Sequence, residues 1–151
     1  MKDTIDQNTA RKAWMGLLAK APEGRIGALL DATMARPGFT WLRAPEIGST
    51  MVRGRAGATG APFNLGEMTV TRCALQLDNG TIGHAYIQGR RKTCAEAAAL
   101  VDALMQTDTA PTLRSQIIDV LQTERDSARA TRAAKAAATK VDFFTMVRGE
   151  D

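Results

Sequence analysis

The chain has few aromatic residues, and this limits the partners that it can have. Aromatic residues make up 5% of its 151 residues, and the formal net charge is +4. Proteins that hold single-stranded nucleic acid stack its bases on aromatic side chains, and most nucleic-acid binders carry a dense basic face. We therefore expect no nucleic-acid partner.

Metal-ligand and thiol motifs are also scarce. Cys73 and Cys94 lie far apart with no CxxC pattern, and His84 is the one histidine. Neither a thiol-redox motif nor a zinc site is indicated, because both need closely spaced cysteines or histidines. We predict two reduced cysteines, no metal, and no cofactor bound by this chain itself.

Long apolar runs are missing. No run approaches the roughly 18 apolar residues of a membrane span, and residues 1–6 lack the apolar core of a signal peptide. The sequence predicts a cytoplasmic protein with no membrane contact. Its length and its 44% hydrophobic content predict one domain over residues 1–151.

The first forty residues predict a helical hairpin. One helix should cover about residues 8–20, with Arg11, Lys12 and Lys20 toward water, and Pro22 should open a second helix that ends at Pro37. Apolar residues at helical spacing support both helices; they are Trp14, Leu17, Leu18 and Ala21, then Ile26, Leu29, Leu30 and Met34.

From Phe39 the pattern changes to short β-compatible runs, which predict an antiparallel four-stranded meander. The runs are 39–43, 50–55, 68–77 and 81–88. Asn79-Gly80 suits a tight hairpin turn between the last two, because it tolerates positive φ. Alternation in the last strand places His84 on one face and Ala85 on the other, and we expect His84 to be half-buried.

The last third predicts helices and an apolar tail, which makes the fold class α+β. Thr93-x-x-Glu96 matches the capping box that starts a helix, and a further helix begins near Leu113. From Ser127 this second pattern becomes alanine and charge, a composition that forms a helix but buries little.

Basic residues supply the candidate anion-binding sites. Arg53 and Arg55 share one strand face, Arg72 lies on the neighbouring strand, and Gly89-Arg90-Arg91-Lys92 precedes a helix whose free N–H groups favour phosphate. Solvated arginines and a basic helix flank are the alternatives. His84 suits a general acid or base, or a satisfied structural histidine. The anion-binding candidates are Arg55, Arg72, Arg90, Lys92 and His84, and no catalytic residue is assigned.

Two further patterns have both a structural and a functional interpretation. Gly54, Gly57 and Gly60 lack the Gly-Lys-Ser/Thr of a P-loop, so they indicate a loop between strands or a loop that closes over a ligand. Three arginines share one face of the late helix, and this pattern indicates either a solvated face or a partner surface. They are Arg125, Arg129 and Arg132.

The chain end is unusually apolar. Residues 141–151 hold two of the four phenylalanines, although chain ends are usually polar. We predict that this segment either packs on its own core or docks on another protein. The partner-binding candidates are Val141, Phe143, Phe144, Met146, Val147 and Arg148.

The same tail, Lys140 to Gly149, resembles the C-terminal signature of the PhnG family, the G subunit of the bacterial carbon-phosphorus lyase system. The resemblance runs nearly end to end. Its other stretches are Arg11 with Trp14-Met15; Arg55–Gly60 with Phe63 and Gly66; Thr69–Arg72; Gly80–Gly83 through Gln88–Arg90; and Leu100–Gln106.

This resemblance implies an accessory subunit of an assembly with I, H, J and L types of subunit. The assembly couples ATP to a phosphonate and displaces adenine, giving ribose 1-methylphosphonate 5-triphosphate from methylphosphonate, with the nucleosidase chemistry assigned mainly to the I subunit. ATP and the phosphonate would be substrates of the complex. The alternative is a free-standing phosphonate- or nucleotide-binding protein.

One position departs from the family pattern. Where the pattern has an acidic residue after Gly-Arg, this chain has Arg91. A salt-bridge role of that position is therefore not carried over, and the local positive charge is higher.

Overall fold

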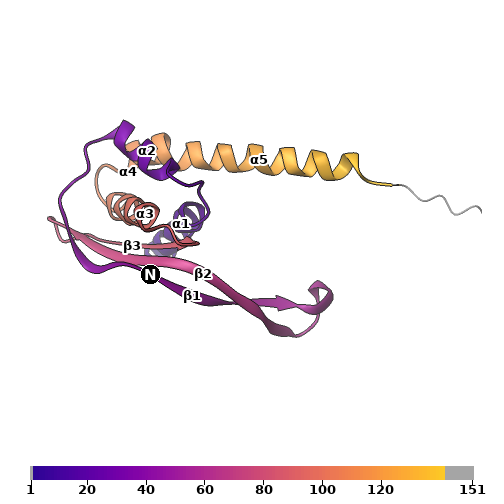
Figure 1. The fold of residues 1–151 in the computed structure, drawn as a ribbon. Coiled ribbons are helices and arrows are strands. Elements are labelled where there is room, and N and C mark those ends of the chain that lie inside the picture. The colour runs from indigo at the N-terminus through magenta and orange to yellow at the C-terminus, as the bar shows by residue number, and fades with distance from the viewer. Residues whose placement is uncertain (1, 142–151) are drawn as a thin grey trace, which may run out of the picture.

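The computed structural model describes residues 2–141, with side chains from residue 7 onward, as a three-stranded antiparallel sheet with helices over one face. Figure 1 shows this sheet below, helices α1 and α3 against it, and the remaining helices above. The predicted α+β class is therefore confirmed. Of the predicted tail, residues 141–151, all but Val141 lie outside the described residues.

Both predicted N-terminal helices are present. Helix α1 spans Lys2–Leu18 and helix α2 spans Arg25–Thr33, and both pack against α3. The expectation that Pro22 opens the second helix is wrong, because Gly24 adopts a left-handed φ of 73° immediately before Arg25. Gly tolerates that conformation without strain, so the turn between the helices continues to Gly24.

The sheet has three strands in the order β1-β2-β3, so the four-stranded meander is wrong. Strand β1 spans Phe39–Arg55 and unites two of the predicted strands. Strands β2 (Pro62–Leu77) and β3 (Ile82–Gln88) complete the sheet. The predicted strands 39–43 and 50–55 are joined through Pro45, because an edge strand tolerates a residue without N–H, and shifts of register on both sides of Arg43 absorb the irregularity.

The turn between β2 and β3 forms as predicted at Asn79-Gly80. Gly80 has a φ of 85°, its N–H donates to the Leu77 carbonyl at 2.9 Å, and the Asn79 side chain accepts from Thr81 N. The alternation of β3 is also confirmed. The expected half-burial of His84 is wrong, because its side chain is exposed on the sheet face away from the helices.

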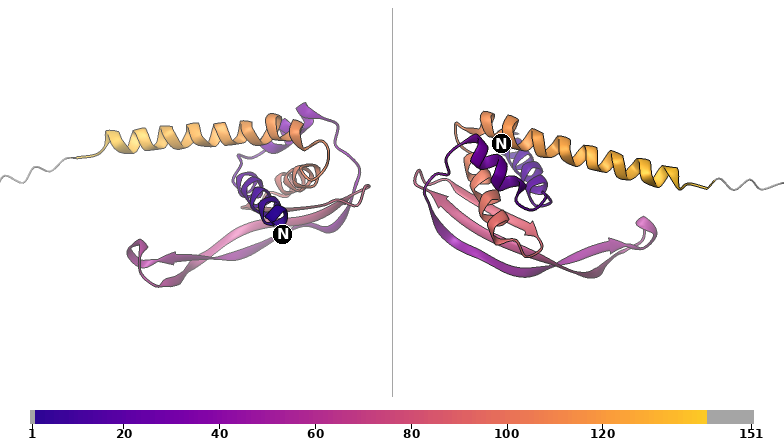
Figure 2. Two further views of the ribbon diagram at one scale, coloured as in Figure 1. Left: turned by 180° about the vertical axis from the view of Figure 1, so that it is seen from behind. Right: turned by 45° about the horizontal axis from the view of Figure 1, so that its top comes forward.

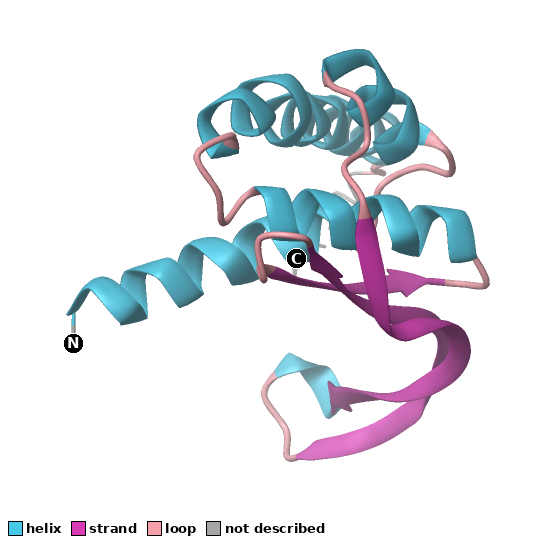
Figure 3. Cartoon of the chain, turned by 90° about the vertical axis from the view of Figure 1, so that its left-hand side faces the viewer, coloured by secondary structure: helices cyan, strands magenta, loops and turns pink. Residues whose placement is uncertain are grey.

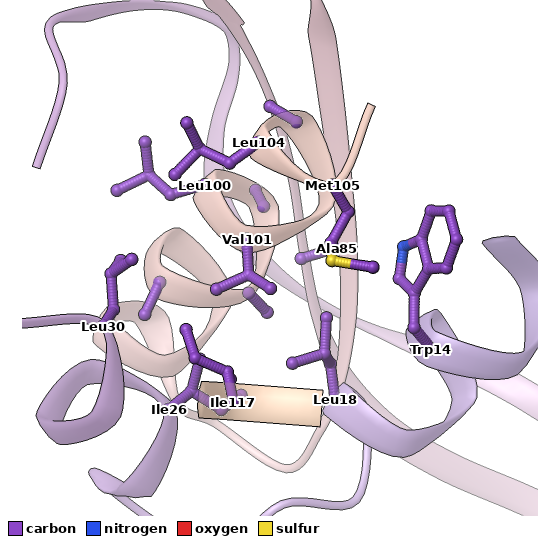
Figure 4. Close-up of a cluster of buried hydrophobic side chains, with 14 of the residues drawn as sticks. Trp14, Leu18, Ile26, Leu30, Ala85, Leu100, Val101, Leu104, Met105 and Ile117 are labelled. Atoms are coloured by element: carbon purple, nitrogen blue, oxygen red, sulfur yellow. The ribbon is translucent and has the colours of Figure 1, made fainter. Parts of the chain in front are cut away.

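Helix α3, Lys92–Leu104, is the centre of the hydrophobic core. Figure 4 shows Leu100, Val101 and Leu104 on this helix, with side chains of α1, α2 and β3 around them. The predicted capping box is wrong. The helix begins at Lys92, Thr93 makes no capping bond, and Glu96 accepts from Arg36 Nη1 at 3.3 Å instead.

The C-terminal helical region starts on the core and then leaves it. Helix α4 (Ala110–Leu113), the π-helical turn η2 (Arg114–Ile118) and helix α5 (Asp119–Ala138) follow one another without a break. Their buried side chains are Leu113, Ile117, Ile118 and Leu121. From Arg125 onward every residue of α5 is exposed, as the alanine-rich sequence predicts.

The strands β1 and β2 extend well past the end of β3 and form a two-stranded arm, residues 48–69. The short 3-10 turn η1, Ala56–Ala58, closes its tip, so the glycine-rich stretch is a loop between strands as one interpretation proposed. Figures 1 and 2 show the arm and α5 projecting from the same side of the body, and Figure 3 shows the strong twist of the arm.

Among the residues that the structure describes, none of the helices is both long and apolar enough to cross a membrane.

Candidate functional site

The buried polar centre of the domain is the carboxylate of Asp102 on α3. It accepts hydrogen bonds from Arg11 Nη2 at 2.7 Å and Nε at 3.1 Å, from Trp14 Nε1 at 2.9 Å, and from the backbone N of His84 at 2.9 Å. Asp102 is 0% exposed, and the Arg11 side chain is 29% exposed. Four donors compensate the desolvation of the charge, so this cluster ties α1, α3 and β3 together.

Sequence reasoning missed this cluster. The expectation that Arg11 faces water is wrong. Asp102 was noted only as part of Leu100–Gln106, one of the stretches that resemble the family. The available signal was an aspartate within the apolar run from Ala97 to Met105, a place where a lone charge needs a partner. Spacing along one helix could not show that the partner lies 91 residues earlier.

The turn from β3 to α3 is held by Arg91. Its Nε donates to the Gln88 carbonyl and its Nη1 to the Ala21 carbonyl, both at 2.9 Å. Its backbone N donates to the Thr71 hydroxyl, which in turn donates to the Gly89 carbonyl at 2.6 Å. The charge of Arg91 is therefore used to fix the turn against the loop after α1, which an acidic side chain could not do.

Arg90 and Lys92 flank this turn and are exposed. Neither has an ion-pair partner among the described residues. Both lie next to the first turn of α3, where the helix dipole favours an anion. Their anion-binding role stays a prediction.

Arg72 and His84 lie on the open face of the sheet. Arg72 stands opposite Tyr86 in the register of β2 and β3 and forms an ion pair with Glu46 of β1. The Tyr86 hydroxyl and the Glu46 carboxylate raise the pKa of Arg72. A carboxylate already neutralises Arg72. This arrangement favours the interpretation of Arg72 as a solvated surface arginine over that of a free anion-binding site.

Arg55 lies elsewhere, at the tip of the arm, where Nη1 donates to the Gly60 carbonyl at 3.0 Å. Nine residues of β1 separate it from Glu46, the partner of Arg72, and a strand rises roughly 3.3 Å per residue. The two arginines are therefore about 30 Å apart along the strand. The structure brings His84 and Arg72 to one face but does not join the five anion-binding candidates into one site.

The two thiols are free, as predicted, and both are buried. Burial, with a smaller contribution from Glu96, raises the pKa of Cys73 to about 12. A thiol with so high a pKa is almost entirely protonated near neutral pH and is a poor nucleophile. Within the described part of the chain, no group of three or more His, Cys, Asp or Glu residues is placed to hold a metal.

The arm carries three of the exposed large apolar side chains of the described chain. Leu65 is 67% exposed, Met51 50% and Phe63 45%. Phe63 and Leu65 approach the same glycine, Gly54, so they lie on one face of the ribbon. A two-stranded ribbon is only marginally stable alone in water, and exposed apolar patches mark surfaces that another molecule covers.

Val141, the one partner-binding candidate within the described residues, is 66% exposed just after α5. The other five, Phe143, Phe144, Met146, Val147 and Arg148, lie outside the described residues.

Fold and surface together define an α+β domain with two projecting elements, the arm and α5, of which the arm exposes large apolar side chains. Comparison with known proteins gives a consistent result. The chain belongs to the PhnG family, because residues 9–149 match the family model described as phosphonate metabolism protein PhnG. This confirms the resemblance seen in the sequence.

One relative comes from Rhizobium meliloti (strain 1021). It is named alpha-D-ribose 1-methylphosphonate 5-triphosphate synthase subunit PhnG, and the two chains are 41% identical over 141 residues. The alignment covers 93% of this chain and 90% of the relative.

Proposed function

We propose that this chain is the G-type subunit of an alpha-D-ribose 1-methylphosphonate 5-triphosphate synthase that acts in the cytoplasm. The likeness over nearly the full length to a protein named as that subunit supports the proposal. In this role the chain assembles with I, H and J types of subunit and supports displacement of adenine from ATP by a phosphonate. ATP and the phosphonate are substrates of the assembly rather than ligands of the isolated chain.

The observation that carries the accessory role is the arm. No other element of the described chain covers its three exposed large apolar side chains. A side chain of this kind contributes roughly 1.5–3 kcal/mol when it moves from water to a fully buried position. Because these side chains are only about half exposed, complete burial of all three would contribute roughly 2–5 kcal/mol. The arm therefore suits a permanent contact with another subunit.

Reconstitution tests the function directly. The I, H, J and L types of subunit would be assayed for adenine release and ribose-phosphonate formation with and without this chain. We expect turnover to require the chain. If turnover were the same without it, the proposed function would be wrong.

A pair of arm variants tests the contact. Leu65→Ser in combination with Phe63→Ser removes apolar surface that is already exposed, so the variant should fold normally by circular dichroism. We expect it to lose co-purification with the I-type subunit, whereas the matched arm variant Asn64→Ser keeps it. Equal recovery of both variants would show that the arm is not the contact.

Calorimetry distinguishes the accessory subunit from the alternative, a free-standing phosphonate- or nucleotide-binding protein. The isolated chain is expected to show no measurable heat with ATP or methylphosphonate. Tight binding of either ligand that Arg90→Ala abolishes would favour the alternative.

A further inference from the structure

A groove with basic walls lies beneath α5. Its volume is about 600 Å³, and it runs between the middle of α5 and the end of α1 with the loop that follows. The buried side chains Leu17 and Leu121 are among the residues that line it. Four cations also line it: Lys20, Arg125, Arg129 and Arg132.

The charge of the groove is uncompensated. The carboxylate that lines it, Glu124, accepts from Arg25 Nε at 3.0 Å and is thereby neutralised. None of the four cations has a carboxylate partner within residues 7–141, the part of the chain whose side chains are described. Neighbouring like charges on one helix face destabilise that helix, so a bound anion would relieve this repulsion.

The spacing of the arginines favours an extended anionic partner over a small anion. Positions 125, 129 and 132 follow one helix face over about 10 Å, given a rise of roughly 1.5 Å per residue. Backbone N–H groups in the middle of a helix are already bonded within the helix, so none is free to cradle a phosphate. The exposed apolar residues of the lining, Pro22 and Ala128, favour an apolar side chain on the ligand as well.

We infer that this groove binds an acidic, amphipathic segment of a partner protein, with carboxylates spread over about 10 Å and an apolar side chain between them. Charge complementarity is the basis of the choice of partner. The inference rests on the proposed function, since it describes one contact of the same assembly. The arm is apolar and the groove is cationic, so the two surfaces select different features of their partners.

The test uses the full chain with the I, H and J types of subunit. Arg129→Glu reverses the charge at the centre of the groove, while Lys135→Glu makes an equal change of charge on the same helix outside the groove lining. We expect Arg129→Glu to weaken assembly at least tenfold at low salt and Lys135→Glu to leave it within twofold. Raising the salt concentration should weaken wild-type assembly and reduce the difference between the variants.

Carbodiimide cross-linking, which joins amines to carboxylates, identifies the segment. In the assembled complex of the Arg129→Lys variant, Lys20 and position 129 should both link to Asp or Glu residues of one short partner segment. Linkage to scattered segments would overturn the inference.

The remaining outcomes are distinct. If the wild-type chain assembles and Arg129→Glu assembles equally well, the groove inference fails and the proposed function stands. If the wild-type chain does not assemble at all, both fail. If ATP binds the isolated chain and Arg129→Glu abolishes that binding, the groove is a phosphate site and the inference is wrong.

Discussion

Replacing Asp102 should destabilise the domain more than any other single carboxylate change within residues 7–141, the part whose side chains are described. Asp102→Ala leaves the buried indole N–H of Trp14 and the backbone N–H of His84 without an acceptor, and it removes the partner of Arg11. An unsatisfied buried donor costs about 1–3 kcal/mol. Breaking a buried ion pair on one side costs about 3–5 kcal/mol.

These figures overlap, because they describe the same lost contacts, so we expect Asp102→Ala to lower the free energy of unfolding by about 3–5 kcal/mol. For a domain of this length the corresponding fall in Tm is on the order of 10 °C. Asp102→Asn should cost less, since its one oxygen still accepts from one donor while its amide faces the others.

Urea denaturation followed by tryptophan fluorescence measures this change, because Trp14 lies within the cluster. Arg11→Ala and the double variant complete a cycle whose coupling energy isolates the ion pair. The control is Glu67→Gln, which neutralises an exposed carboxylate with no ion-pair partner among the described side chains and should not change stability beyond the error of the assay. A loss below about 1 kcal/mol for Asp102→Ala, with an unchanged denaturant slope, would refute the reasoning.

Three further predictions concern packing, reactivity and pH. Gly83→Ala places a methyl group 2.8 Å from the Cβ of Ala103 and should destabilise the chain by about 1–3 kcal/mol, measured by thermal unfolding. The control Gly48→Ala meets nothing within 4 Å and should not change the stability. Equal melting temperatures of the two variants would contradict the prediction. Cys73 should react with iodoacetamide at pH 8 only after unfolding, because burial raises its pKa to about 12. Rapid labelling of Cys73 in the native chain, detected by mass spectrometry, would show that the prediction is wrong. The hydrogen bond from Arg25 lowers the pKa of Glu124, so this ion pair stabilises the fold above the ordinary carboxyl pKa of 4.5, and the stabilisation is lost as the pH falls through the lower folded-state pKa. The stabilities of Glu124→Gln and wild type, measured as the pH is lowered, should therefore converge in acid. Two stability curves that stay parallel would disprove the prediction.

The sequence predicted elements whose determinants are local. The turn at Asn79-Gly80, the two faces of β3 and the apolar side of α3 each depend on residues within a few positions of one another. The same is true of the alanine-rich half of α5, which has no buried side chain beyond Leu121.

The elements that depend on distant residues were not predictable. Strand β1 continues through Pro45 because it lies at the sheet edge, which is a property of topology. The start of α3 is set by Arg91 and Thr71, so the local Thr93 signal had no effect. Likewise the groove under α5 needs Lys20 opposite the three arginines, and only the folded chain places it there.

The candidate site was predicted less well than the fold. The candidates were chosen by their charge alone, and the sequence could not show that Glu46 neutralises Arg72 or that Arg55 lies at the tip of an arm. That the two strands project beyond the sheet as an arm gave no signal, because Phe63 and Leu65 alternate as in any strand.

The outer edge of β3 has a further consequence for assembly through backbone pairing. The carbonyl of Ile82 accepts from Arg11 and Gln106, and Asp102 takes the N–H of His84. At Gln88 the N–H donates to Ala19 and the carbonyl accepts from Arg91. A strand added along this edge would have to break these bonds at both ends of β3. Strand addition is therefore directed to the far side of the sheet, where β1 keeps an uninterrupted register from Glu46 to Val52, at the base of the arm.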